Sequence, residues 1–174
     1  MKSLIIIAFR DFQDMEYLIP KQMLEKSGIE TKTISNKKGM AIGVFGETVL
    51  INETVSEVQI DDYDSLIFVG GGGCLTNLDN QDSYRIIKEA VEKDKLLAAI
   101  CISPVILAKA GVLENKKATV WSSPIDQFPI KKLKENKAIY QKGPIVIDGK
   151  IITAQGPEVA NLFGEAIIGL LTKK

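Results

Sequence analysis

The chain has 174 residues, of which 45% are hydrophobic and 25% charged, and its 22 Lys and Arg balance its 22 Asp and Glu. A net charge of zero leaves no electrostatic footprint for a nucleic acid or an anionic membrane, and the length predicts one domain over residues 1–174. There is no histidine, which excludes a Ser-His-Asp or Cys-His arrangement within the chain.

Two cysteines, Cys74 and Cys101, exclude a disulfide framework, and without histidine they disfavour a zinc site. We therefore expect no metal and no cofactor, and a reducing cytoplasm as the location. No apolar run approaches the roughly 20 residues that cross a bilayer, so no membrane partner is expected. The Ile-rich start turns polar at Arg10, and a buried first strand explains it better than a signal peptide.

In chain order, the first part alternates short apolar strands with an amphipathic helix. Asp14 is placed to cap that helix and Gly28 to end it. Two alternating runs around Phe45-Gly46-Glu47 predict a small hairpin appended to the main sheet. The predicted elements are a strand over 3–8, a helix over 14–27, a strand over 29–35, hairpin strands over 40–44 and 48–51, and a buried strand over 65–69.

Four glycines, Gly70 to Gly73, follow that buried strand directly. Glycine permits positive φ and lets backbone N–H groups face a ligand, so the run can be an oxyanion or phosphate cradle. It can also be only a flexible turn. A Walker loop is excluded because no Gly-Lys-Ser/Thr follows.

The second part continues the alternation, with Pro157 opening the last helix and an Asp148-Gly149 turn joining a hairpin. These patterns predict a three-layer α/β/α flavodoxin-like sandwich with a mostly parallel sheet and the added hairpin. The predicted elements are a crossover helix over 81–93, strands over 96–100 and 117–121, helices over 105–110 and within 124–135, strands over 138–140 and 145–152, and a helix over 158–171.

Cys101 ends the apolar strand that begins at Leu96, and Pro104 opens a helix at once. A nucleophile-type side chain at such a bend is the layout of a nucleophile elbow. The N–H groups and the dipole of the following helix would favour thiolate over thiol. Free cysteine is also among the most buried residue types, and the local pattern equally fits a cysteine that only packs.

The segment Ala99-Ile100-Cys101, with Pro104 after it, resembles the elbow of the ThiJ/PfpI superfamily. That group contains the parkinsonism-associated protein deglycase, glyoxalase-type chaperones and PfpI-type peptidases, on a class I glutamine amidotransferase-like fold. Three further stretches resemble the family in the same order along nearly the whole chain. They are residues 12–20, residues 62–72 and residues 146–157.

The resemblance implies that Cys101 is a nucleophile and a redox-sensitive thiol. It implies that Glu16 is the protonated partner carboxyl, and that the amides of Gly71 or Gly72 and of Ile102 are oxyanion donors. Hydrogen bonds to a thiolate lower its pKa, which is how cysteine becomes reactive without histidine. Without the resemblance, Glu16 is simply an acid in the first turn of a helix.

The chain departs from the family where many relatives place a histidine, at the elbow or in the strand over 117–121. Ile102 and Trp121 stand there instead, which disfavours PfpI-type peptidase activity. Gln155 replaces a frequent arginine, which bears on how an anionic substrate is held. Trp121 and Pro157 are candidate pocket walls, although a tryptophan at position 121 is more often a core residue.

The resemblance implies a cysteine-dependent protein that acts on small reactive aldehydes or glycated substrates through a hemithioacetal on Cys101, assisted by Glu16. One alternative is a non-enzymatic redox sensor or chaperone in which Cys101 oxidises to sulfinate. Another is a flavodoxin-like module whose glycine loop binds phosphate. We also expect a homodimer, with Met15 and Met23 of the first helix and the added hairpin as its associating surface. Cys74 is expected in a loop, near enough to resolve a sulfenate on Cys101.

Overall fold

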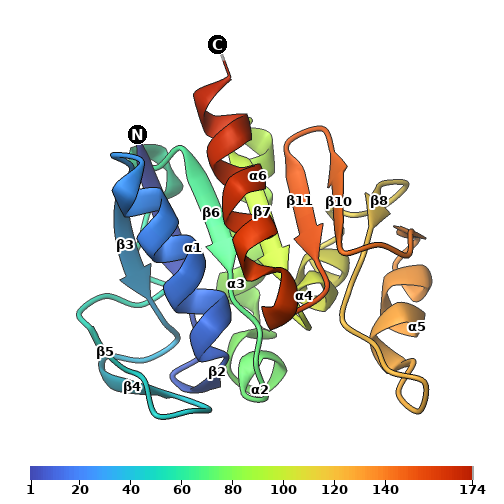
Figure 1. Cartoon of the computed structure of the whole chain (residues 1–174), viewed down its shortest axis with the longest axis horizontal. Coiled ribbons are helices and arrows are strands. Elements are labelled where there is room, and N and C mark those ends of the chain that lie inside the picture. The colour runs from blue at the N-terminus through green and yellow to red at the C-terminus, as the bar shows by residue number, and fades with distance from the viewer. Residues whose placement is uncertain (174) are drawn as a thin grey trace.

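The computed structural model of the protein describes residues 1–173, and its centre is a six-stranded sheet (Figure 1). The strand order is β10-β11-β7-β6-β1-β3, and all neighbours are parallel except the β10–β11 hairpin. This confirms the predicted mostly parallel α/β sandwich. The strands are β1 (Lys2–Ile6), β3 (Glu30–Ile34), β6 (Ser65–Phe68), β7 (Leu96–Ile100), β10 (Ile145–Asp148) and β11 (Ile151–Ala154).

Helices cover both faces of this sheet. On one face, α1 (Asp14–Lys26) and α6 (Ala160–Thr172) pack side by side, in front of the sheet in Figure 1. On the other face, α3 (Gln81–Glu92) and α4 (Pro104–Lys109) pack against β6 and β7. All five residues of β7 are buried because helices cover both of its faces, which explains its continuous apolar run.

A second, three-stranded sheet lies beside the first, in the order β2-β4-β5. Its strands are β2 (Arg10–Phe12), β4 (Gly39–Gly43) and β5 (Thr48–Ile51). The hairpin β4–β5 was predicted correctly, but it pairs with β2 and is not appended to the main sheet. The sequence does not reveal β2, because three residues with exposed Arg10 and Asp11 carry no alternating pattern.

The first helix begins differently from the prediction, because Gln13 and not Asp14 is its N-cap. The Gln13 side chain accepts a hydrogen bond from the Met15 N–H at 2.7 Å. Asp14 is the first helical residue, and its buried carboxyl accepts the N–H groups of Phe45 at 2.9 Å and Glu47 at 2.8 Å. Asp14 therefore ties the hairpin turn to the start of α1.

Several short elements complete the chain, and two of them differ from the expectation. The predicted strand over 117–121 keeps only two ladder residues, because the Thr119 N–H donates to the Thr153 hydroxyl and the Trp121 N–H to the Cys101 carbonyl. Cys74 begins a helix rather than lying in a loop. The short elements are η1 (Ile60–Asp62), α2 (Cys74–Leu78), β8 (Lys117–Ala118), α5 (Phe128–Glu135), β9 (Ile139–Tyr140) and η2 (Pro157–Val159).

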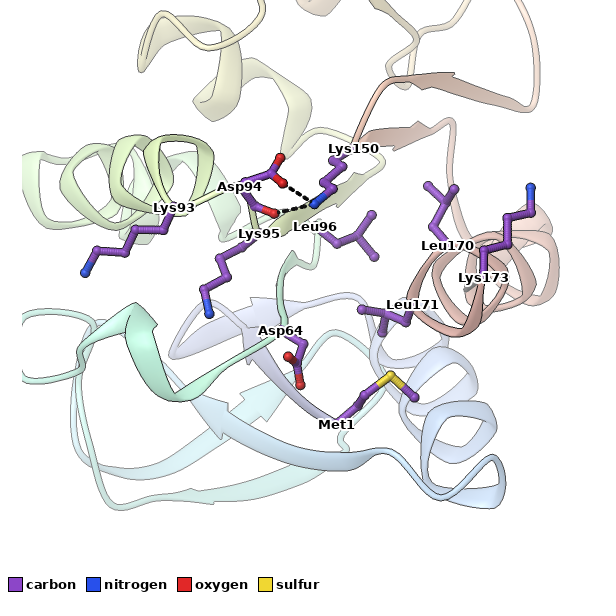
Figure 2. Close-up of a pocket in the computed structure, with 10 residues that line it drawn as sticks. All are labelled: Met1, Asp64, Lys93, Asp94, Lys95, Leu96, Lys150, Leu170, Leu171 and Lys173. Atoms are coloured by element: carbon purple, nitrogen blue, oxygen red, sulfur yellow. Dashed lines mark hydrogen bonds and ion pairs between the residues drawn. The ribbon is translucent and has the colours of Figure 1, made fainter.

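One cavity of about 480 Å³ lies at the end of the sheet where β6 and β7 begin (Figure 2). Its lysines come from three distant segments, and Lys150 is bound there by the Asp94 carboxylate and carbonyl. None of the site residues predicted from the sequence lies in it. Within residues 1–173, no helix is both long enough and apolar enough to span a bilayer.

Candidate active site

Cys101 lies at a strained bend between β7 and α4. Its φ is 65°, in the left-handed region that non-glycine residues rarely adopt. The Cys101 N–H donates to the Ala154 carbonyl at 2.9 Å, and its own carbonyl accepts the Trp121 N–H at 2.8 Å. These bonds fix the backbone on both sides of the side chain, which is the geometry of a nucleophile elbow.

The Ser103 side chain stabilises this bend through hydrogen bonds, a role that the sequence did not suggest. Its fully buried hydroxyl oxygen accepts the Ile100 N–H at 3.0 Å. The same oxygen lies 2.9 Å from the Phe68 carbonyl and 2.7 Å from the Ile100 carbonyl, and it can donate to one of them. Ser103 therefore links β6, β7 and the first residues of the turn.

Glu16, in the first turn of α1, is fully buried next to Cys101. One carboxyl oxygen, Oε2, accepts the Gly70 N–H at 3.0 Å, and Oε1 has no hydrogen-bond partner among the described residues. Burial raises the pKa of Glu16 to about 8, although hydrogen bonds with the Cys101 thiol and the Gly70 N–H partly oppose the rise. The carboxyl therefore keeps its proton at neutral pH.

The pKa of Cys101 moves in the direction opposite to the sequence-based expectation. Burial and the adjacent Glu16 carboxyl raise the pKa of the thiol well above its usual range. The N–H groups of Gly71 and Ile102 point at the sulfur and lower the pKa, but they do not outweigh the loss of solvation. Because α4 has only six residues, its dipole is small, and Cys101 is a thiol at neutral pH.

The glycine run is a packed turn, in which close contacts leave no room for a side chain at Gly70, Gly71 or Gly73. A Cβ on Gly70 would lie 2.6 Å from the Cys101 Cβ and 2.7 Å from Glu16 Oε2. Gly71 has a φ of 110°, and a Cβ there would lie 2.5 Å from the Asp11 carbonyl oxygen. This packing presses the run against β2 and Cys101, and it does not favour an open phosphate cradle.

A cavity of about 290 Å³ opens beside the Cys101 side chain. Trp121 is partly buried and forms one wall, whereas Pro157 begins η2 and does not line the cavity. Leu75 lines it from α2, and the sequence did not single it out because this short helix was expected as a loop. The lining residues are Gly71, Gly72, Leu75, Cys101, Ile102 and Trp121.

The other cysteine is placed differently. Cys74 is fully buried, does not line the cavity, and burial raises the pKa of its thiol strongly. The structure thus brings together Glu16, Gly71, Ile102 and Cys101, but it gives Cys74 no access to solvent. Within residues 1–173, no group of three or more cysteine or carboxylate side chains is placed to hold a metal ion.

Comparisons with known proteins agree on one family. The family model described as DJ-1/PfpI matches residues 1–170. An uncharacterized protein of Methanocaldococcus jannaschii is 38% identical over 173 residues, which cover 99% of this chain and 83% of the relative. A protein of Thermococcus kodakarensis named as a deglycase is 31% identical over 157 residues, which cover 90% and 91%. The crystal structure of a ThiJ/PfpI domain protein from Brachyspira murdochii has a TM-score of 0.92 at 31% identity, covering 98% of this chain and 95% of that one.

Proposed function

The chain belongs to the DJ-1/PfpI family, and on this premise we propose that it is a cysteine-dependent enzyme that acts on small reactive aldehydes or on the glycated products they form. In the proposal Cys101 is the nucleophile and Glu16 its proton-transfer partner. The observation that carries it is the buried Glu16 carboxyl beside the partly buried Cys101, which lines a small cavity. The deglycase-named relative supports the same reaction class.

The proposed first step is addition of the Cys101 thiol to an aldehyde carbonyl. A bond forms between sulfur and carbon while the π bond of the carbonyl breaks, and the product is a hemithioacetal. The thiol proton passes to Glu16 as Glu16 gives its own proton to the carbonyl oxygen. A carboxyl with a pKa of about 8 suits both transfers near neutral pH, and the Gly71 and Ile102 N–H groups are the nearest donors for the developing oxygen charge.

A second candidate function is redox sensing through oxidation of Cys101 to sulfinate. The observation that favours it is the set of donors around the sulfur, namely the protonated Glu16 carboxyl and the N–H groups of Gly71 and Ile102. These donors would stabilise a sulfinate. The raised pKa of the thiol opposes the reaction, since thiolate is the form that peroxide oxidises.

Peptidase activity is not favoured. The chain has no histidine to protonate an amine leaving group, and a cavity of about 290 Å³ gives little room for an extended peptide.

Methylglyoxal consumption by the wild-type protein and two matched cysteine variants tests the proposed function. Cys101→Ala should abolish consumption, whereas Cys74→Ala should retain it because Cys74 does not line the cavity. Equal consumption by all three proteins would refute aldehyde chemistry at Cys101. Sulfinate at Cys101 after peroxide treatment, without aldehyde consumption, would select the sensing function.

We also propose that two copies associate through the exposed face of the β4–β5 hairpin. Met40 and Leu50 are opposite each other in the ladder, and Ile42 lies on the same face. All three side chains are exposed, and such a patch is typical of an interface. Met23, expected at this interface, instead faces α6, where its Sδ would lie 2.8 Å from a Cβ on Gly164.

A further inference from the structure

The cavity beside Cys101 has no charged side chain among its lining residues. Its side-chain walls are Leu75, Ile102 and Trp121, and the remaining surface is glycine backbone and the cysteine itself. Leu75 and Ile102 also pack against the hydrophobic core, which fixes these walls in place. A ligand that enters must therefore leave its water for apolar surface and a few backbone N–H groups.

A negative side chain, Glu158, lies near the Glu16 carboxyl. Glu158 lies close enough to Glu16 for its carboxylate to raise the pKa of Glu16, and a Cβ on Gly156 would lie 2.9 Å from Glu158 Oε2. Lys142 lines a neighbouring cavity that shares no lining residue with this one. An anionic group at Cys101 would thus meet no cation among the lining residues.

We infer that this cavity selects uncharged carbonyl compounds with an apolar or aromatic substituent and excludes compounds that carry a carboxylate. The inference rests on the proposed function and narrows its substrate class. Burying a carboxylate without a partner is costly, whereas an aromatic ring gains contact with the Trp121 indole. Trp121 and Leu75 are then the residues that determine specificity.

Two alkylating reagents of nearly equal size show the effect of the charge of a ligand without a change in its shape. Iodoacetamide is neutral and iodoacetate is anionic, and each forms a sulfur–carbon bond with Cys101 while iodide leaves and the thiol proton goes to solvent. The ratio of their rates is measured at the Cys101 peptide by mass spectrometry, in the folded protein and in the urea-unfolded protein. We expect the ratio of the iodoacetamide rate to the iodoacetate rate to be about tenfold larger in the folded protein than in the unfolded protein. A tenfold change in this ratio corresponds to a difference of about 1.4 kcal/mol between the two reagents.

Two substitutions at Leu75 provide a matched control for the charge. Leu75→Lys places a cation in the lining and should bring the folded ratio back to the unfolded value. Leu75→Met keeps the wall neutral and of similar size, and should leave the ratio as in the wild type. The aromatic preference is measured by the ratio of the N-phenyl iodoacetamide rate to the iodoacetamide rate. This ratio should be larger in the folded protein than in the unfolded protein. In Trp121→Ala the ratio should be the same in both states.

Equal reagent ratios in folded and unfolded protein would overturn the inference. These readouts need no turnover. A protein with the expected ratios but no aldehyde consumption would refute the proposed function alone, and a protein with turnover but equal ratios would refute only the inference.

Discussion

The buried Glu16 carboxyl and the Cys101 side chain meet at Gly70, where a Cβ would lie 2.7 Å from Glu16 Oε2 and 2.6 Å from the Cys101 Cβ. Two acidic groups in one such site titrate as a pair. When one of them loses its proton, the negative charge makes loss of the second proton harder. Burial places the pKa of Glu16 at about 8, so the pair is neutral below that pH. We therefore expect the reactivity of Cys101 to depend on the protonation of Glu16.

The first prediction concerns stability and pH. Because the pKa of Glu16 is raised from 4.5 to about 8 on folding, the folded state keeps a proton that the unfolded state loses above pH 4.5. This contribution is fully present below pH 4.5 and is lost as the pH rises to about 8, with a total of about 5 kcal/mol. Urea unfolding of wild type and Glu16→Gln at pH 5, 7 and 9 measures it. The free energy of unfolding should fall more steeply in the wild type, and parallel profiles would show that Glu16 has an ordinary pKa.

The second prediction compares two neighbouring glycines that both line the cavity. Gly71→Ala should destabilise the protein by about 1–3 kcal/mol, because a Cβ there meets the Asp11 carbonyl oxygen and the Gln13 nitrogen at 2.5 Å and the φ is positive. Gly72→Ala should change little, since the nearest atom is 4.0 Å away. Chemical denaturation of both variants is the measurement. Equal losses would mean that the tight packing of Gly71 is not what holds the turn.

The third prediction concerns the link between the hairpin and α1. Asp14→Ala removes two part-buried hydrogen bonds, from the N–H groups of Phe45 and Glu47, at a total cost of about 1–3 kcal/mol. Hydrogen exchange at these two amides should accelerate. Asp61→Ala is the matched control, because that exposed carboxylate forms a surface ion pair with Lys93, and such pairs contribute little to stability. Unchanged exchange in Asp14→Ala would show that other contacts hold the hairpin turn.

The fourth prediction concerns association. Leu50→Asp introduces a charge into the exposed hairpin face and should convert a dimer into a monomer in light scattering at micromolar concentration. Ile125→Asp changes a side chain that is 98% exposed elsewhere and should leave the mass unchanged. A monomeric wild type, or a dimeric Leu50→Asp variant, would rule out this interface.

The main sheet and its helices could be predicted from the sequence because hydrophobic periodicity and flanking glycines mark them. Strand β2 and helix α2 could not, since three and five residues are too short to show a period. Missing α2 also hid Leu75 as a cavity wall and the burial of Cys74. Strand β2 and the glycine run before α2 are held together by tertiary contacts, which a local sequence pattern does not show.

The placement of Cys101 at an elbow and of Glu16 beside it followed from the elbow pattern and the family resemblance. The direction of the pKa shift of Cys101 did not. A local pattern shows the helix that follows the cysteine, but it does not show how much solvent the fold removes from the sulfur. Ser103 was noted only as a departure from glycine, and its buried hydroxyl proves to connect β6, β7 and the turn.

The most direct test of the coupled pair is the rate of Cys101 alkylation by iodoacetamide from pH 6 to pH 10, in wild type, Glu16→Gln and Glu16→Ala. Glutamine keeps a hydrogen-bond donor but cannot ionise, so the Gln variant should follow a single titration and match the wild type below pH 8. The wild-type rate should rise less steeply above pH 8, where the Glu16 carboxylate opposes the thiolate. Glu16→Ala also lacks the carboxylate that raises the thiol pKa, so above pH 8 it should react faster than the wild type. Because it lacks the donor as well, it should react more slowly than the Gln variant. Three superimposable profiles would contradict the account, because Glu16 would then be only an acid at the start of a helix.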